Sequence, residues 1–323
     1  MLIGPKGRPA KFTNWSFGQF CRQVNAPAGY LATLPGPLAV DALTYGWGKR
    51  QKEDPDRAVN VLATVNGDVH LRSLTSEKYS RIWNASLVER LLDLQDRGWK
   101  VPPGMPAGLE GEQTRKATEE DTGPYTLVTP GMDIAPSGLY ASDRDMFAFV
   151  IHPDRVVMDG SHPLFRGAIV GNSEVGASAF WMLTFLFDYV CYNHNIWGAK
   201  VTGKVSVRHV GDAAARAGGF EAYIEDFTSS SGKEDEQAIV RARSHLIGST
   251  EQEVCDFVFG KKIASLTDAK AAYQIANERE RYGDPRCVWG MVNGLTEVSQ
   301  SKSYANERTE LDRNAAKLMQ LVF

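Results

Sequence analysis

The spacing of hydrophobic positions predicts two helices before residue 55. Residues 13–24 follow Thr13 or Asn14, either of which can cap a helix, and their aromatic side chains then gather on or near one face. Pro37 suits the first position of a second helix, which we expect to run to about residue 50. Both helices precede the first run of β-branched residues.

A hairpin and a third helix follow. Residues 58–65 are rich in β-branched side chains and residues 68–74 alternate, with Asn66-Gly67 between them. Because both residues of such a turn need positive φ, Asn-Gly is a strong signal for a β-hairpin. Leucines at helical spacing then predict a helix that Asn84 caps and Gly98 ends.

The remaining pattern changes from strands to helices near Gly211. Extended segments are expected at 125–128, 138–141, 146–151, 165–170 and in two or three runs within 177–210. Helices are expected at 212–226, 234–247, 250–260, 266–282, 287–299 and 303–321. We therefore predict an α+β fold with a β-rich N-terminal two-thirds, mostly antiparallel with hairpins and a few helices, and a helical C-terminal third.

This pattern also suggests how the chain divides. Residues 1–12 are predicted to form a basic flexible arm, and 13–211 an α+β core. Residues 102–124, rich in proline and glycine, are predicted to be a mobile loop in that core. Residues 212–323 are expected to form a helical region packed on the core.

Composition describes an ordinary globular protein with unevenly placed charge. The chain has 323 residues, 43% hydrophobic and 23% charged, and a net charge of −3. Such a balance argues against a protein that coats DNA through a strongly basic surface. Residues 1–40 contain no acidic residue, however, and 195–218 hold four Lys or Arg against one Asp. A local basic site is therefore compatible with the acidic total.

The cysteines and the apolar runs indicate a cytoplasmic location, in the host cell if the gene is carried by a phage. Four cysteines lie far apart without paired spacing, which is typical of reduced, buried thiols. No apolar signal segment is apparent at the N-terminus. The apolar run 177–192 contains Thr184 and Asp188, so we expect no membrane span and no membrane partner.

The stretch from Arg166 to Gly211 is the strongest candidate for a binding site. It holds the most apolar run of the chain between polar turns, followed by an alternating basic ribbon. Basic side chains beside aromatic rings are what single-stranded nucleic acid requires. The candidate nucleic-acid-binding residues are Arg166, Asn172, Asn195, Trp197, Lys200, Lys204, Arg208 and His209. A solvated strand face above core aromatics, with asparagines in tight turns, explains the same pattern.

Motifs for catalysis are missing, so we expect no catalytic residue, no metal and no cofactor. The glycines near 171 fit neither a dinucleotide-binding nor a phosphate-loop spacing. Carboxylates at Asp143, Asp145, Asp154 and Asp159 leave open a Mg²⁺-dependent enzyme acting on nucleic acid or nucleotides. Turn formation accounts for them equally well. A zinc site from His152, His162 and a distant cysteine is disfavoured for lack of a paired motif.

Several segments resemble one known family. The sequences Leu74–Tyr79 with Asn84, Gly167–Gly176, Cys191-Tyr192-Asn193, Arg208–Gly211 and Trp289–Glu297 are similar to the phage/plasmid-like protein family known as domain of unknown function 932. The likeness spans about residues 55–300, and Asn-Ser-Glu-Val-Gly and Arg-His-Val-Gly are its specific parts. His194 follows Asn193 where members usually have glycine, which changes the turn expected there.

The resemblance implies an origin in a phage, prophage or plasmid and transfers no catalytic residue. With the basic ribbon, it favours a non-enzymatic accessory protein that binds nucleic acid, chiefly single-stranded DNA, in replication or recombination. A homo-oligomer is an expected form. A structural or host-interaction protein is the further alternative, and it would show an apolar surface patch instead of a basic one.

Overall fold

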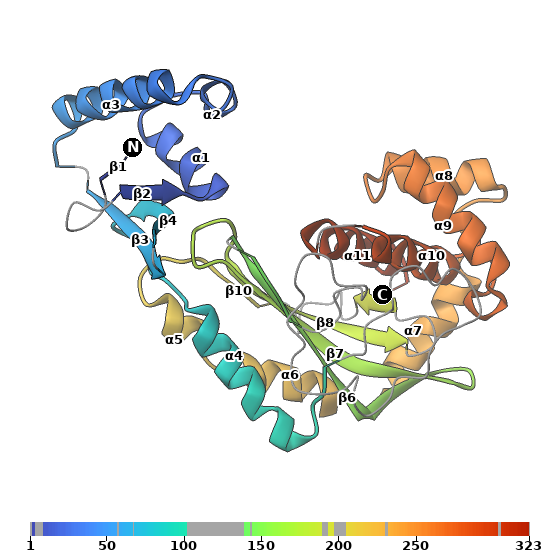
Figure 1. Ribbon diagram of the computed structural model, residues 1–323. Coiled ribbons are helices and arrows are strands. Elements are labelled where there is room, and N and C mark those ends of the chain that lie inside the picture. Colours follow the sequence, from blue (N-terminus) through green and yellow to red (C-terminus); the bar gives the residue numbers. More distant parts are fainter. Residues whose placement is uncertain are drawn as a thin grey trace.

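The computed structural model describes residues 2–3, 9–56, 58–66, 68–101, 139–142, 144–188, 193–196, 205–229, 232–302 and 305–322 (Figure 1). The predicted strand at 125–128 and the predicted mobile loop at 102–124 lie outside these residues. Two sheets organise the described chain, a four-stranded sheet near the N-terminus and a six-stranded sheet in the middle.

The N-terminal unit is a small sheet with helices on it. Its strand order is β1-β2-β4-β3, with β2 parallel to β4 and the other pairs antiparallel. Its elements are β1 (Leu2–Ile3), β2 (Pro9–Phe12), α1 (Asn14–Gln23), α2 (Ala28–Leu31), α3 (Gly36–Glu53), β3 (Val59–Asn66) and β4 (Asp68–Ser76). The predicted hairpin is confirmed, since Asn66 pairs with Asp68. Thr13 caps α1 by accepting from the Ser16 N–H.

The central sheet is antiparallel, in the order β10-β8-β7-β6-β5. Its strands are β5 (Leu139–Ala141), β6 (Met146–Asp159), β7 (His162–Asn172), β8 (Phe180–Asp188), β9 (Asn193–Ile196) and β10 (Val205–Val207). β9 also pairs with β8, opposite Phe185–Asp188, whereas β10 pairs opposite Phe180–Met182. β9 and β10 therefore take opposite ends of β8.

Helices bury both faces of this sheet. Even-numbered residues of β6 from Met146 to Val150 pack with α4 (Asn84–Asp93) and α6 (Phe220–Ser229). Odd-numbered residues from Phe147 to Ile151 form an aromatic cluster with Ala316 of α11 (Ala305–Met319). Because side chains alternate along a strand, a sheet covered on both sides needs continuous apolar runs.

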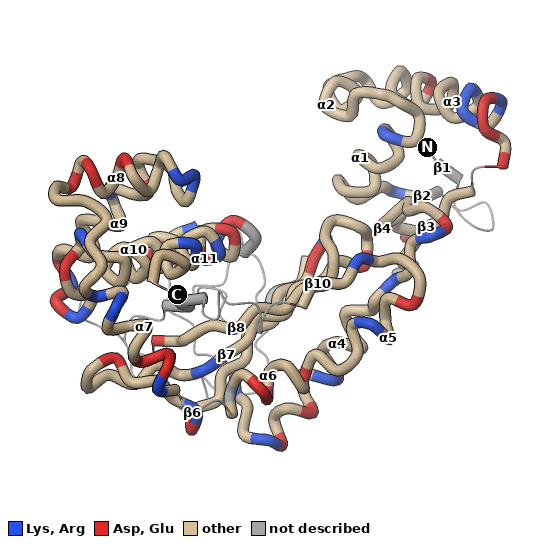
Figure 2. Tube along the Cα trace, turned by 180° about the vertical axis from the view of Figure 1, so that it is seen from behind, with Lys and Arg blue, Asp and Glu red and all other residues tan. Residues whose placement is uncertain are grey.

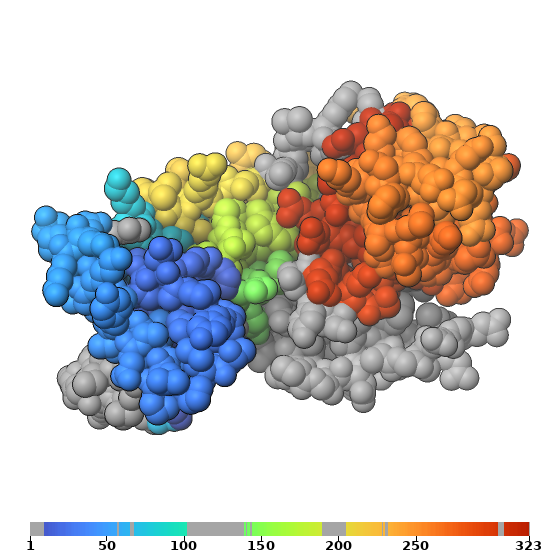
Figure 3. Space-filling model, turned by 90° about the horizontal axis from the view of Figure 1, so that it is seen from above, coloured from blue at the N-terminus to red at the C-terminus, as the bar shows by residue number. Residues whose placement is uncertain are grey.

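The C-terminal helices form a second core against the far end of the sheet. They are α7 (Lys233–Ser244), α8 (Glu251–Gly260), α9 (Leu266–Glu278), α10 (Val288–Gln300) and α11. α10 is buried along most of its length and packs on α9 and α11. Seen from above, these helices and the N-terminal unit lie on opposite sides of the central strands (Figure 3).

The predicted fold class is wrong in its layout. The protein is α+β, but strands concentrate in the middle, and helix exceeds strand in the first hundred residues because α1, α3 and α4 are longer than their neighbouring strands. The predicted helix at 212–226 is two helices, α5 (Ala213–Ala217) and α6, because Gly219 adopts φ +82° between them. The other helices predicted after residue 230 are confirmed, with small shifts at their ends.

Candidate functional site

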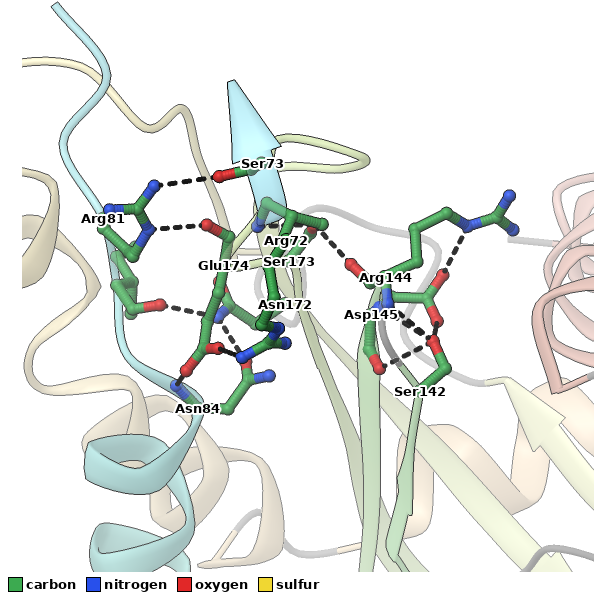
Figure 4. Close-up of polar contacts among 12 residues, drawn as sticks. Arg72, Ser73, Arg81, Asn84, Ser142, Arg144, Asp145, Asn172, Ser173 and Glu174 are labelled. Atoms are coloured by element: carbon green, nitrogen blue, oxygen red, sulfur yellow. Dashed lines mark hydrogen bonds and ion pairs between the residues drawn. The ribbon is translucent and has the colours of Figure 1, made fainter. Parts of the chain in front are cut away.

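The loop that joins β7 to β8 is fixed by its own side chains. Ser173 Oγ donates to the Arg144 carbonyl oxygen at 2.6 Å and accepts from the Ala177 N–H at 2.9 Å. Gly176 adopts φ +82°, which a side chain would strain. Ser173 therefore ties residues 172–176, named here the NSEVG loop, to the turn before β6 that holds Arg144 (Figure 4).

Glu174 of this loop joins three separate segments. Its Oε1 accepts from the backbone N–H of Asn84 at 2.8 Å, and its Oε2 lies 3.2 Å from Nη1 of Arg72. Arg81 Nε donates to the Glu174 carbonyl oxygen at 2.7 Å. The carboxylate is nearly buried, so the arginine and the positive end of α4 together offset the cost of desolvating it.

Asn84 is not the helix cap that its sequence position predicts. Trp83 holds the cap position of α4 and makes no side-chain cap hydrogen bond. Glu174 accepts from the free N–H instead, while Asn84 Oδ1 accepts from Asn172 Nδ2 at 2.7 Å. A carboxylate distant in sequence thus does the work expected of a local amide.

Tyr79 and His209 bring two further segments to the loop. The Tyr79 hydroxyl donates to the Ser173 carbonyl oxygen at 2.7 Å, and its ring stacks on His209 with centroids 4.9 Å apart. His209 Nδ1 lies 3.1 Å from the Ser80 carbonyl oxygen. Since a carbonyl only accepts, Nδ1 carries the proton of the neutral ring. Segments around residues 79, 173 and 209 therefore form one structural unit.

Burial changes the acid–base behaviour of this pair. It raises the pKa of Tyr79 to about 12, against a smaller lowering effect of Arg81. Burial is also the main cause that lowers the pKa of His209, and Arg81 lowers it further. His209 Nε2 is buried and has no hydrogen-bond partner in the structure, so protonation there would place an unsatisfied charge in the unit.

Arginines lie over tryptophan rings on both sides of the NSEVG loop. Arg22 and Arg144 stand 5.4 Å and 5.6 Å from the ring centroid of Trp15, whose Nε1 donates to the Val175 carbonyl oxygen at 2.9 Å. Arg81 stands 5.4 Å from the ring of Trp83, which is 48% exposed. These are cation–π distances. We call these five residues the Arg–Trp surface.

Some predicted site residues are engaged inside the fold. Arg166 is 1% exposed, donates to the Phe227 carbonyl oxygen and pairs with Asp235 at 2.5 Å. Asn172 is 1% and His209 5% exposed, and both hold the NSEVG loop unit together. Their side chains are positioned to support a surface rather than to form it.

The other predicted nucleic-acid-binding residues are either on the surface or backbone of described segments or outside the described residues. Arg208 is exposed beside the buried His209. Its backbone carbonyl oxygen accepts a hydrogen bond from the Arg216 side chain. Asn195 lies on β9, where its backbone is opposite Leu186. Trp197, Lys200 and Lys204 lie outside the described residues. Of the eight residues, the structure thus brings Asn172, Arg208 and His209 to one place.

Sequence reasoning missed the Arg–Trp surface itself. Two signals were available in the sequence. Arg81 stands two residues before Trp83, and Arg22 stands two helical turns after Trp15. Arg144 carried no such signal, because it reaches Trp15 from the turn between β5 and β6, far along the chain.

The carboxylates considered for a metal site lie apart from one another wherever the structure describes them. Asp145 Oδ1 accepts from Ser142 Oγ beside the start of β6, whereas Asp159 at its other end pairs with Arg243 and accepts from Trp289 Nε1. Asp154 is exposed between them, and Asp143 is not described. No cluster of three or more metal-ligating side chains occurs in the part of the chain that the structure describes.

Comparison with known families identifies most of the chain. The family model described as domain of unknown function (DUF932) matches residues 125–322. The chain belongs to this family. The match covers the central sheet and the C-terminal helices, and it begins after the N-terminal unit. A search of curated proteins and a search of solved structures found no match.

No helix in the described ranges is long and apolar enough to cross a membrane.

Proposed function

We propose that this protein binds single-stranded nucleic acid, chiefly single-stranded DNA, through the Arg–Trp surface. It acts without catalysis, as an accessory protein of replication or recombination in the cytoplasm of a cell that hosts a phage or plasmid. The observation that carries the proposal is the pairing of arginines with tryptophans on both sides of the NSEVG loop.

The way these arginines are held leaves their charge available. A carboxylate neutralises an arginine, but an aromatic ring orients the guanidinium without cancelling its charge. Arg81 also donates to the Glu174 carbonyl and to Ser73 Oγ, both uncharged acceptors. Arg144 does have a carboxylate partner, since its Nε lies 3.7 Å from Asp145 Oδ2. We therefore expect Arg22 and Arg81 to contribute more than Arg144 to the affinity for nucleic acid.

The rings favour unpaired bases. A tryptophan face can stack on a base only where the base is free of its partner strand, and each such stack is worth about 1–3 kcal/mol. Trp83 offers the more exposed ring. Arg208 is a further exposed cation in the same region, since the next residue, His209, stacks on Tyr79. A local surface of this kind functions despite the net charge of −3, because nucleic-acid affinity depends on the cations at the contact.

A fluorescence anisotropy titration tests the proposal. A labelled oligothymidine and the same length of duplex DNA are titrated with the full chain at low salt and again at rising salt. We expect tighter binding to the single strand and an affinity that falls steeply with salt, by a slope of about −0.7 per phosphate contacted. Absence of binding at tens of micromolar protein, or equal binding to both DNAs with no salt dependence, would overturn it.

A further inference from the structure

We propose that two copies of this chain associate through the outer face of α3, with the two α3 helices antiparallel. This interface is separate from the Arg–Trp surface and does not depend on nucleic-acid binding. It is centred on Tyr45, which lies beside its own counterpart in the second copy.

The outer face of α3 is apolar and unusually exposed. Tyr45 is 76% and Leu38 55% exposed, and Tyr30 of the neighbouring α2 is 61% exposed. The helix is Gly36–Glu53, yet its buried residues are Leu43 and Arg50. Large apolar side chains that gather on one exposed face mark an interaction surface, whereas single ones do not.

Charge is almost absent from this part of the surface. Between Arg22 and Lys49 the sequence holds one charged residue, Asp41. Figure 2 shows α2 and most of α3 nearly free of charged residues, with charges gathered at the end of α3. The face carries the acid Asp41 toward one end and the exposed cations Lys49 and Lys52 at the other, so it lacks the single sign of charge that would favour nucleic acid or anionic lipid as occupants.

Asp41 favours a second copy of this chain as the partner that covers the face. Leu38, Ala42 and Tyr45 share one face of α3, because residues four and seven apart align on a helix. Antiparallel pairing about Tyr45 places Ala42 opposite Gly48 of the second copy, and small residues allow two helices to approach closely. It also brings Asp41 of each copy within reach of Lys52 of the other. Asp41 and Lys52 are both exposed, so this contact is formed twice.

Sedimentation velocity over a concentration series tests the interface in the full chain without nucleic acid. We expect a monomer–dimer equilibrium, and we expect Tyr45→Lys to shift it to monomer. The matched control is Val240→Lys, since Val240 is 66% exposed on α7, away from the interface. Circular dichroism confirms that both variants are folded.

A charge exchange identifies the pairing. Asp41→Lys alone should weaken the dimer at least several-fold, because it sets two lysines against each other. Adding Lys52→Asp in the same chain should restore it. Within one helix the two positions are about 16 Å apart, so the rescue cannot come from a contact inside one copy.

Three results would overturn the inference. These are a wild-type monomer at every concentration, a dimer that survives Tyr45→Lys, and a double exchange that fails to restore association. Because the measurement uses no DNA, failure of this interface is distinguishable from failure of the proposed DNA binding.

Discussion

The Glu174 carboxylate accepts from the backbone N–H of Asn84 at 2.8 Å, so a loop of the central sheet caps a helix that lies much earlier in the chain. The same carboxylate pairs with Arg72 on β4. One side chain thereby ties the N-terminal unit, α4 and the sheet together, and it holds the residue that follows Trp83.

Replacing Glu174 by Gln should destabilise the protein by about 2 kcal/mol or more. The variant leaves Arg72 without its carboxylate and weakens the cap of α4, and such losses typically cost about 1–2 kcal/mol for a cap and more for a buried ion pair. Urea unfolding measures the change. Glu77→Gln, at an exposed position beside the same unit, is the control. Equal and small losses in both variants would show that Glu174 has no such role.

Acid should weaken the unit around His209. Burial lowers the pKa of His209 in the folded state, so the unfolded chain binds the proton more readily. Stability is therefore fully present above the unfolded pKa of about 6.5 and is lost as the pH falls below it. His209→Phe retains a ring against Tyr79 and should lose less stability on acidification. Urea midpoints at neutral and mildly acidic pH compare the two proteins, and parallel losses would contradict the assignment.

Alkali should act on Tyr79 in the opposite direction. Burial raises its pKa to about 12, so the unfolded chain releases the phenolic proton first. The resulting stability is present below the unfolded pKa of about 10 and is lost as the pH rises toward 12. Tyr79→Phe should remove this loss, at a cost of about 1 kcal/mol at neutral pH for the missing bond to Ser173. Unfolding free energies across alkaline pH check both effects, and an unchanged alkaline slope in the variant would refute the first.

The sequence predicted local features better than long-range ones. Asn66-Gly67 and the cap at Thr13 act on residues next to them, so the hairpin and the first helix could be located from pattern alone. By contrast, the burial of both faces of the central sheet depends on helices that lie elsewhere in the chain. The apolar run in β8 therefore indicated burial but not what buries it.

The candidate site was predictable only in part, for the same reason. Asn172 and His209 were recognised as unusual, but their roles as internal supports depend on Ile82, Asn84 and Ser80, which follow the N-terminal unit. Trp15 is an ordinary helical aromatic in the sequence. It becomes part of a candidate binding surface only when the fold brings Arg144 to it.

Removing the charge of Arg22 and Arg81 should weaken DNA binding and reduce its salt dependence. If each guanidinium contacts one phosphate, the double change to Gln should lower the slope of log affinity against log salt by about 1.4 for a single strand. Anisotropy titrations at several salt concentrations measure the slope. Lys270→Gln removes an exposed cation on α9 and should leave it unchanged. A slope identical in all three proteins would place the contact elsewhere.

Trp83→Ala should weaken binding about tenfold while the protein remains folded. The ring is 48% exposed, so its loss removes a stacking surface more than a core contact. Tyr223→Ala is the control, because Tyr223 is 51% exposed on α6. Affinities for oligothymidine and unfolding midpoints of both variants are compared. Unchanged affinity in the Trp83 variant would mean that this ring does not stack on a base.

Ultraviolet cross-linking of the full chain to a single-stranded oligonucleotide, with the linked peptides identified by mass spectrometry, tests the location of binding most directly. The account predicts cross-links in the peptides that contain Trp15 and Trp83, and their loss at high salt. Cross-links confined to the C-terminal helices α7–α11, or none at all, would contradict it.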